Sequence, residues 1–348
     1  MPTVSDLLQG PVGRHASLEP TERFPIPAAG AAPLRIVFMG TPDFAVPCLQ
    51  ALIDGPDEVI GVVARPDMPA GRGQKMVSPP TIQLAREHGI RTFQPKALKS
   101  GPFPEALGAL GADLFVVVAY GRILPSAILE MPRLGCINVH ASLLPRLRGA
   151  GPIQWSVLRG DAVSGVTTMW MDEGMDTGDM LRVAELPLRP DETGQSLHDK
   201  LSVLGAALLR ETLDCLHRGS LTFTPQPHDG VTFAPMLKKE DGAIDWSRPA
   251  RELDWHVRGM HPWPGAFTFR AKTRLVIEAG EVHEAGADAA PGAVLSASPA
   301  GIDVATGDGV YRITRVKPAG KKAMAAGDYA RGHAFERGER LGPEAGAS

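Results

Sequence analysis

Short apolar runs that alternate with helical patterns constrain the fold of this chain more than any other feature. The first run, LRIVFM at residues 34–39, is typical of a strand that is buried on both faces. The turn after it predicts a helix with Thr41 at the N-cap and Pro42 at the first helical position. Four more strands are predicted, at residues 58–64, 91–94, 114–118 and 136–140. This alternation predicts an α/β fold with a doubly wound, mostly parallel sheet.

The pattern changes in the second half of the chain. A strand pair at residues 165–171 and 180–188 and a long helix at 196–217 complete the α/β segment. After residue 240 the apolar runs are short and are broken by glycine turns, which indicates a small, OB-like antiparallel β-barrel. We expect a disordered extension, an α/β domain, a linker and a barrel domain, at residues 1–33, 34–221, 222–240 and 241–341.

Composition and charge exclude several classes of protein. The formal net charge is −3 over 348 residues, so a nucleic-acid partner would have to be bound by a local basic patch. The three cysteines have no paired spacing, which argues against a disulfide framework and against a metal site. The sequence shows neither a secretory signal nor an apolar run of about 18 residues, so we expect a cytoplasmic protein that does not contact a membrane. We also expect a monomer.

A polar pair interrupts the predicted strand at residues 136–140. Asn138 and His140 are two residues apart, so their side chains share one face of the strand at its carboxyl end, where parallel sheets bind ligands. The acidic, glycine-spaced segment DEGMDTGD at 172–179 could bring Asp176 to His140, and its other acids are expected to be solvated or to cap turns. On these residues alone, such a pair is more often structural than catalytic.

The chemistry of these three side chains suits direct acyl transfer to an amine. A carboxylate beside a histidine favours the imidazolium and orients it, and an asparagine amide can donate hydrogen bonds to a developing oxyanion. The sequence has no nucleophile elbow GxSxG, which argues against a covalent intermediate. The segment MGTPDFA supplies one glycine where the dinucleotide fingerprint needs three, so NAD is not expected.

Two segments, INVHASLLPRLRGAGPIQ and MDEGMDTGDM, resemble the folate-dependent formyltransferases. The segments MGTPDFAVPCLQAL, RPDMPAGRGQKM and HPWPG further resemble the members that act on charged initiator tRNA. The resemblance covers residues 34 to about 341 and implies a Rossmann-like formyltransferase domain followed by an OB-like domain that binds tRNA. It also implies transfer of the formyl group of 10-formyltetrahydrofolate to methionyl initiator tRNA, with Asn138, His140 and Asp176 at the chemistry. Ala141 and Leu147 stand where the family commonly has glycine and tryptophan.

The resemblance also implies binding residues for both substrates. The folate site is expected to include Arg122 and the four residues of the SLLP segment, Ser142, Leu143, Leu144 and Pro145. The loop at 65–80 is expected to reach the tRNA acceptor stem through Arg72 and Lys75. The run YRITRVKPAGKKAM holds five basic residues with no acid between them; such a run is usually a solvated face, but on a small barrel it is a candidate for phosphate binding. The residues expected to bind tRNA phosphates there are Lys317, Lys321 and Lys322.

Three other functions are left open by the sequence. A folate-dependent formyltransferase that acts on a small amine, such as glycinamide ribonucleotide or an amino sugar nucleotide, would use the same three residues. The loop at 65–80 and the carboxyl-terminal barrel favour a macromolecular acceptor instead. A non-catalytic RNA-binding protein on the same fold would not need Asn138, His140 and Asp176. A hydrolase that releases formate from the same cosubstrate is the third alternative.

Overall fold

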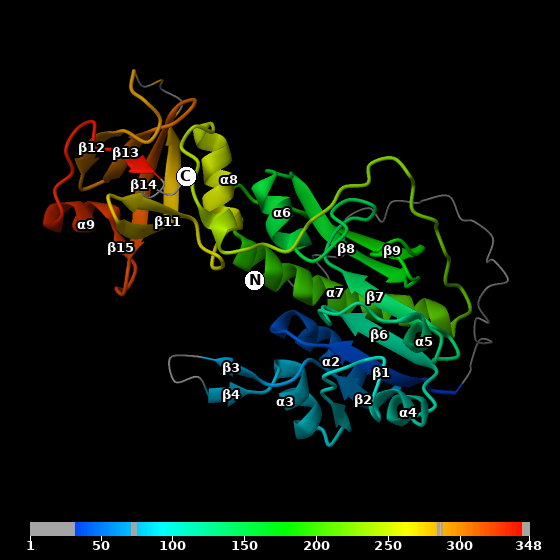
Figure 1. Ribbon diagram of the computed structural model, residues 1–348. Coiled ribbons are helices and arrows are strands. Elements are labelled where there is room, and N and C mark those ends of the chain that lie inside the picture. Colours follow the sequence, from blue (N-terminus) through cyan, green and yellow to red (C-terminus); the bar gives the residue numbers. More distant parts are fainter. Residues whose placement is uncertain (1–31, 71–74, 284–285, 287, 343–348) are drawn as a thin grey trace. The chain divides into compact units, whose positions relative to one another are not determined.

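The computed structural model describes residues 32–70, 75–283, 286 and 288–342 (Figure 1). The chain divides into two compact units. The first contains the described residues up to Pro152 together with residues 163–187 and 198–234, and the second contains residues 153–162, 188–197 and those from 235 onward. The extension predicted at residues 1–33 lies outside the described residues, except for its last two.

A seven-stranded sheet forms the centre of the first unit, in the order β5-β2-β1-β6-β7-β8-β9. The five strands from β5 to β7 run parallel, and β8 and β9 continue the sheet as antiparallel strands. The strands are β1 (Arg35–Gly40), β2 (Glu58–Val63), β5 (Thr92–Phe93), β6 (Leu114–Val118), β7 (Cys136–His140), β8 (Val163–Trp170) and β9 (Met180–Pro187). The mostly parallel sheet predicted from the sequence is confirmed.

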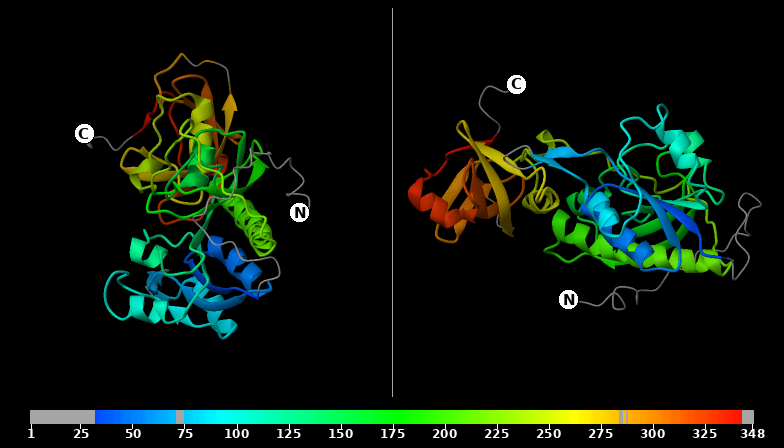
Figure 2. Two further views of the ribbon diagram at one scale, coloured as in Figure 1. Left: turned by 90° about the vertical axis from the view of Figure 1, so that its right-hand side faces the viewer. Right: turned by 90° about the horizontal axis from the view of Figure 1, so that it is seen from below.

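Helices cover both faces of this sheet (Figure 2). On one face, Leu107 of α4 and Ile128 of α5 pack in a cluster with Phe115 of β6. On the other face α7 lies close to β7, because a Cβ added at Gly205 would come 3.1 Å from Val139 Cγ1. The fold is therefore doubly wound. The helices are α2 (Val46–Ile53), α3 (Pro80–Glu87), α4 (Phe103–Gly108), α5 (Ser126–Leu129) and α7 (Gly194–His217).

The helix α7 is 24 residues long and has one apolar stripe of leucines. The five leucines that the sequence predicts to be buried are buried: Leu197, Leu201, Leu204, Leu208 and Leu209. The stripe covers one side only, and most residues on the other sides are polar. Within the described parts of the chain, neither α7 nor any other helix is long and apolar enough to cross a membrane.

The turn after β1 differs from its prediction. A short 3-10 helix, η1 (Asp43–Ala45), comes first with Pro42 at its N-cap, and the α-helix α2 starts only at Val46. Thr41 does not cap a helix: its Oγ1 accepts from Arg65 N at 3.2 Å and donates to Tyr120 O at 3.1 Å. The assignment of Thr41 as N-cap was wrong because the backbone N–H of Arg65, after β2, donates to the hydroxyl oxygen that would otherwise accept from the helix.

The segment at 65–80, for which the sequence predicts a loop, contains an antiparallel β-hairpin of β3 (Met68–Ala70) and β4 (Lys75–Val77) (Figure 1). Pro69 pairs with Met76 in this ribbon. The prolines in and around these strands make them unrecognisable in the sequence, because proline disfavours a strand prediction. Pro69 is tolerated here because both strands of a two-stranded ribbon are edge strands. Gln94 Nε2 donates to Asp67 Oδ1 at 2.6 Å and so ties the hairpin to the loop after β5.

The second unit contains a curled antiparallel sheet, in the order β12-β13-β14-β11-β10-β16, with β15 beside β14. Two backbone hydrogen bonds of 2.8 Å, from Val294 N to Glu339 O and from Leu341 N to Gly292 O, join the two ends of the sheet. The small antiparallel barrel predicted for this region is therefore confirmed as a curled sheet. The strands are β10 (Phe267–Arg270), β11 (Thr273–His283), β12 (Val294–Ser298), β13 (Gly301–Ala305), β14 (Val310–Pro318), β15 (Met324–Ala325) and β16 (Leu341–Gly342).

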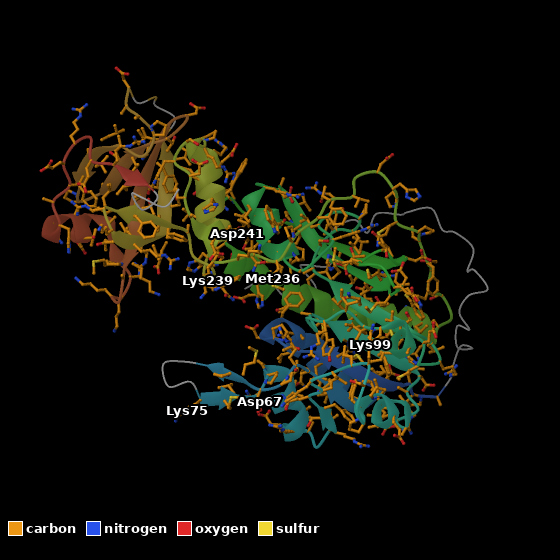
Figure 3. The ribbon with its side chains drawn as sticks, viewed as in Figure 1. Asp67, Lys75, Lys99, Met236, Lys239 and Asp241 are labelled. Carbon is orange, nitrogen blue, oxygen red and sulfur yellow. The ribbon has the colours of Figure 1, made fainter. Side chains whose placement is uncertain are left out.

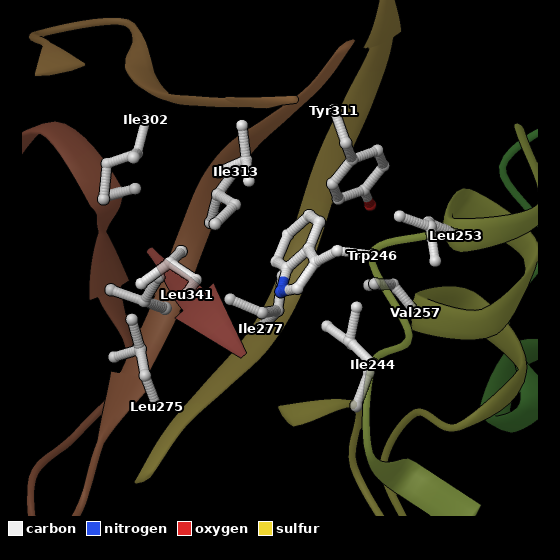
Figure 4. Packing of buried hydrophobic residues seen from close by; sticks show 14 of the residues in the cluster. Ile244, Trp246, Leu253, Val257, Leu275, Ile277, Ile302, Tyr311, Ile313 and Leu341 are labelled. Carbon is white, nitrogen blue, oxygen red and sulfur yellow. The ribbon is translucent and has the colours of Figure 1, made fainter. Parts of the chain in front are cut away.

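The core of the second unit lies between this sheet and α8 (Figure 4). Trp246 packs among Val257 of α8 and Ile277 of β11, and its indole Nε1 donates to Thr268 Oγ1 at 3.0 Å. This bond satisfies a donor that would otherwise be buried without a partner. The helices of this unit are α6 (Pro152–Leu158), η2 (Glu240–Gly242), α8 (Ala250–Gly259) and α9 (Ala326–Gly332).

Candidate active site

The strand β7 carries the polar pair to the edge of the sheet where the parallel strands end. Asn138 lies between Val117 of β6 and Met169 of β8. His140 is the last residue of β7, and only 6% of its surface is exposed. Because side chains alternate along a strand, Asn138 and His140 lie on one face, as predicted.

Two oxygen atoms face the ring of His140. Its Nε2 lies 3.0 Å from Leu147 O, and because a carbonyl can only accept, Nε2 donates this hydrogen bond. Its Nδ1 lies 3.7 Å from Asp176 Oδ1. The structure thus brings Asp176 to His140, as the sequence suggested. The contact with Asp176 is longer than a hydrogen bond, so Nδ1 is the ring atom with capacity for another partner.

The carboxylate of Asp176 is oriented by the backbone. Its Oδ2 accepts a hydrogen bond from Gly149 N at 2.8 Å, which leaves Oδ1 toward His140. The segment around Asp176 is built by Asp172, whose Oδ1 accepts from Gly174 N at 3.0 Å and from Thr177 Oγ1 at 2.6 Å. Asp172 is therefore a turn-capping residue, one of the two roles expected for it.

The side chain of Asn138 is half-buried. Among the described residues, its amide has no hydrogen-bond partner, although the ring of His140 on the same face has two oxygen neighbours. An amide with both N–H groups unused can donate to a ligand oxygen. The site therefore combines a free donor, a histidine and an oriented carboxylate.

The segment from 224 to 234 also forms part of this site. No sequence pattern predicts this role of the segment. Thr224 forms a bridge with Met180, and Thr232 Oγ1 accepts from Leu147 N at 2.9 Å. The side chain of Gln226 contacts both the loop after β7 and the loop that contains Asp176. These residues lie in the stretch predicted to be a linker, and their partners are mainly backbone atoms, which leave no sequence signal.

The residues expected to bind folate follow His140 directly. Ser142 is buried, and its Oγ donates to Arg146 O at 2.7 Å. Leu144 is buried in a cluster with Met169 and Met180, whereas Leu143 and Pro145 are half-buried. The hydroxyl of Ser142 therefore shapes the loop. The accessible surface of the segment comes from its apolar side chains.

Arg122 lies in the loop after β6 and is half-buried. Its Nη1 donates to Pro95 O at 3.0 Å and to Lys96 O at 3.1 Å. These bonds tie the loop after β6 to residues 95–96. Arg122 therefore has a structural role whatever else it contacts.

The two tRNA candidates in the first unit differ in what the structure describes. Arg72 lies outside the described residues. Lys75 is exposed at the start of β4, and Figure 3 shows it on the far part of the hairpin, whereas Asp67 lies nearer the sheet. A cation in this position is free to meet a partner.

The basic run of β14 is less uniform than the sequence indicates. Arg312 Nε lies 2.7 Å from Asp303 Oδ1, and Arg315 Nε lies 3.2 Å from Glu278 Oε2. The run has no acid within it, but neighbouring antiparallel strands place acids beside these two arginines. The lysines that follow are exposed, and none has an ion pair in the described part of the chain: Lys317, Lys321 and Lys322.

Cys136 lies on the same face as the polar pair but does not offer a nucleophile. The thiol is buried, and burial raises its pKa to about 12. A neutral thiol is a poor nucleophile, so covalent catalysis by this residue is disfavoured. Across the described residues, no group of three or more histidine, cysteine, aspartate or glutamate side chains is arranged to hold a metal ion.

Comparison with known proteins gives two family matches. The sequence profile of the formyl transferase family matches residues 34–213, and that of the formyl transferase C-terminal domain matches residues 236–334. A methionyl-tRNA formyltransferase of Desulfotalea psychrophila is 50% identical over 311 residues, which cover 89% of this chain and 94% of that protein.

Solved structures with a similar fold are more distant in sequence. WlaRD, a sugar 3N-formyl transferase, matches with a TM-score of 0.63 and 15% identity over 84% of this chain and 100% of that one. A variant of HypX from Aquifex aeolicus matches with a TM-score of 0.59 and 18% identity over 86% of this chain. The match covers 48% of HypX, so this chain spans about half the length of that protein. At these identities the likeness concerns the fold alone.

Proposed function

Because the chain belongs to the formyl transferase family, we propose that it transfers the formyl group of 10-formyltetrahydrofolate to the amino group of methionyl initiator tRNA. The chain is thus a transferase of translation initiation. The acceptor is supported by the relative from Desulfotalea psychrophila, which is 50% identical over nearly its whole length. The structural observation behind the proposal is the contact of His140 with Asp176 beside the amide of Asn138, which has no partner among the described residues.

In this reaction the amine, as its free base, attacks the formyl carbon. A C–N bond forms, and negative charge develops on the formyl oxygen. The amide of Asn138 donates to that oxygen, and the imidazolium of His140 adds positive charge beside it. Asp176 stabilises the imidazolium and orders a water that carries the proton from the amine toward the folate nitrogen. The bond between the formyl carbon and that nitrogen then breaks, and the protonated folate nitrogen leaves. No protein nucleophile is needed.

We assign the folate site to the loop after β7 and to the loop after β6. Leu143 and Pro145 supply half-buried apolar surface for the cosubstrate, and buried Ser142 and Leu144 fix the loop beneath them. Arg122 lies at the rim and interacts with the acidic part of the folate. The segment follows His140 directly, so a ligand bound to it lies close to the reacting groups.

The tRNA is bound by cations at two places. Arg72 and Lys75 of the segment at 65–80 reach the acceptor stem, and Lys317, Lys321 and Lys322 of the second unit bind phosphates. A small amine as acceptor is not favoured, because the relative at 50% identity acts on methionyl-tRNA by name, whereas the sugar formyltransferase is 15% identical. A non-catalytic RNA-binding protein would have no use for the oriented Asp176.

The proposed division of the chain follows from these roles. Residues 34–221 form the catalytic domain, 222–240 the linker and 241–341 the OB-like domain that binds tRNA, after an extension at 1–33. We propose that the protein acts in the cytoplasm, where charged tRNA is found, as a monomer without membrane contact.

The test is a formylation assay with the purified full-length protein and 10-formyltetrahydrofolate. The acceptors are methionyl initiator tRNA, methionyl elongator tRNA, glycinamide ribonucleotide and an amino sugar nucleotide. We expect efficient formylation of methionyl initiator tRNA and a much lower rate with the other three. Preferential formylation of either small amine, or release of formate without transfer, would overturn the proposal.

A further inference from the structure

Gln226 lies between the two loops that carry the site residues. Its Nε2 donates to Asp176 O and to Gly178 O, each at 2.8 Å. Its Oε1 accepts from Arg148 Nε at 3.1 Å and from Arg148 Nη2 at 2.7 Å. The amide has two N–H donors and two lone pairs, so these four bonds use its whole capacity. A side chain that is bonded so completely fixes the distance between the groups it joins.

These bonds close a ring of contacts around the histidine. Arg148 follows Leu147, whose carbonyl accepts from His140. The guanidinium of Arg148 holds Gln226, and Gln226 holds the backbone of Asp176. The carboxylate of Asp176 then faces the histidine at 3.7 Å. In order, the ring runs through His140, Leu147, Arg148, Gln226 and Asp176.

The direct contact between His140 and Asp176 does not fix the position of either side chain. Their 3.7 Å contact is too long for a hydrogen bond, so its geometry depends on what fixes each partner. Asp176 has a φ of +55°, in the left-handed region that a non-glycine residue keeps only where the surroundings enforce it. The bonds of Asp172 Oδ1 stay within the same loop. The hold on Asp176 from outside this loop comes from Gly149 N and Gln226.

We propose that Gln226, held by Arg148, is a positioning residue that sets Asp176 against His140. This inference rests on the proposed function. Removal of the two donors of Gln226 frees the carbonyls of Asp176 and Gly178, and the strained backbone can then relax away from the histidine. A misplacement of about 1 Å can reduce a rate by about 10²-fold. We therefore expect Gln226→Ala to lower kcat by roughly 10- to 100-fold, with little change in KM for either substrate.

The charge-changed variant Gln226→Glu tests whether the donor Nε2 or the acceptor Oε1 of Gln226 is needed for turnover. Its carboxylate still accepts from Arg148, but it places oxygen atoms where Nε2 now meets two carbonyls. If kcat depends on the hydrogen bonds from Nε2 to Asp176 O and Gly178 O, kcat should fall nearly as much in Gln226→Glu as in Gln226→Ala. The matched control is Gln50→Ala, because the amide of Gln50 donates to Asp54 at the exposed end of α2.

A second measurement does not depend on activity. The ring nitrogen signals of His140 in the free, ¹⁵N-histidine-labelled protein report on the groups that face Nδ1 and Nε2. We expect these signals to move in Gln226→Ala and in Gln226→Glu and to stay in Gln50→Ala. Arg148→Met should move them as well. The double variant Gln226→Ala with Arg148→Met should have about the same kcat as the more severely affected single variant, because both residues act through one contact.

The outcomes separate this inference from the proposed function. Unmoved His140 signals in folded Gln226→Ala would overturn the positioning role, even if formylation fell. A rise in KM with unchanged kcat would overturn it too, because that would make Gln226 a binding residue. Failure of the wild-type protein to formylate methionyl-tRNA would instead overturn the proposed function. The His140 signals would then still show whether Gln226 positions Asp176 against His140. If Gln226→Ala does not fold, Gln226→Glu gives the same decision.

Discussion

Two histidine–aspartate pairs of the first unit, those of His217 with Asp57 and of His140 with Asp176, differ in what else their atoms bind. His217 Nε2 lies 2.9 Å and 3.1 Å from the two carboxylate oxygens of Asp57, and Asp57 Oδ1 also accepts from Leu34 N at 2.8 Å. His140 Nδ1 lies 3.7 Å from Asp176 Oδ1. Short hydrogen bonds join His217 to Asp57, and we call this the closed pair. No hydrogen bond joins His140 Nδ1 to Asp176, so Nδ1 can bind another partner, and we call this the open pair.

This difference separates a structural pair from a candidate catalytic pair. His217 ends α7, where a positive charge is favourable at the helix terminus, and its contact ties the helix to the residues that precede β2. His140 ends a strand beside Asn138, whose amide has no partner among the described residues. Unused hydrogen-bonding capacity on both members of a polar pair at the end of a parallel strand distinguishes the candidate active site from the structural pair.

The largest expected effect comes from breaking the open pair. We expect His140→Ala, Asn138→Ala and Asp176→Ala each to lower turnover by at least roughly 10²-fold without unfolding the protein. The three side chains act on one transition state, so double variants should lose much less than the product of the single losses. Steady-state formylation of methionyl-tRNA, with circular dichroism as the check on folding, measures this. Near-normal turnover in any single variant would remove that residue from the chemistry.

The sequence predicts the open pair better than it predicts its surroundings. Asn138 and His140 are two residues apart on a strand, and Asp176 lies in a glycine-spaced acidic segment, so both features are local patterns. Gln226 has no such signal, because it lies in a proline-rich stretch without periodicity and bonds to backbone carbonyls. Residues that bind main-chain atoms across the fold cannot be identified from spacing alone.

The next largest effect comes from breaking the closed pair. Asp57→Ala leaves Leu34 N and the ring of His217 without their acceptor, so we expect the free energy of unfolding to fall by about 1–3 kcal/mol. Turnover per folded molecule should not change. Urea unfolding at pH 7 measures the decrease. The control is Asp199→Ala at the exposed contact with His198, where the expected change is below about 0.5 kcal/mol.

A reduced turnover in Asp57→Ala, once corrected for the folded fraction, would contradict the comparison. It would mean that the closed pair also influences the active site. Equal destabilisation by Asp57→Ala and by Asp199→Ala would contradict it in another way, because burial and multiple acceptor bonds would then carry no extra weight.

The fold is predictable where burial dictates the pattern. The parallel strands are apolar on both faces and are clearly recognisable, and the curled sheet of the second unit shows alternation with glycine turns. The hairpin of β3 and β4 escapes prediction because it is exposed and contains Pro69. The pairing of Arg312 with Asp303 escapes it because strand register brings together residues that the chain separates.

The same distinction between closed and open groups applies to the basic run of β14. Arg312 and Arg315 already have acids beside them, whereas Lys317, Lys321 and Lys322 do not within the described chain. We expect the triple change of these lysines to alanine to weaken tRNA binding roughly tenfold at low salt. The slope of log K against log salt should fall by about 0.7 to 0.9 for each phosphate that the variant no longer neutralises.

Fluorescence binding titrations of tRNA at several salt concentrations measure both quantities. Arg315→Ala is the control, since the charge of Arg315 is balanced by Glu278, and we expect a smaller effect on the slope. Formylation at saturating tRNA should persist in the triple variant. Unchanged affinity with an unchanged slope would mean that the lysines form only a solvated face.

The smallest effect concerns a histidine with no carboxylate at hydrogen-bond distance among the residues that the structure describes. His256 in α8 is buried, and its pKa is lowered mainly by burial and also by Arg248, against a backbone hydrogen bond at Gly242 and the charge of Asp241. Its Nε2 has no hydrogen-bond partner in the described part of the chain. A closed pair such as that of His217 supplies a carboxylate to accept from the ring; His256 has no such acceptor at its Nε2.

The consequence is a stability that depends on pH. Below a pH of about 6.5 the unfolded chain binds a proton at His256, whereas the folded unit keeps the ring neutral, so stability falls as the pH falls. The decrease attributable to this residue should approach about 1.4 kcal/mol for each pH unit below that value until the folded ring also titrates. Hydrogen exchange of the α8 and β11 amides at pH 7.0, 6.0 and 5.5 measures it in the full chain. His256→Leu should flatten the dependence, and an equally steep decrease in that variant would assign the acid sensitivity to other groups.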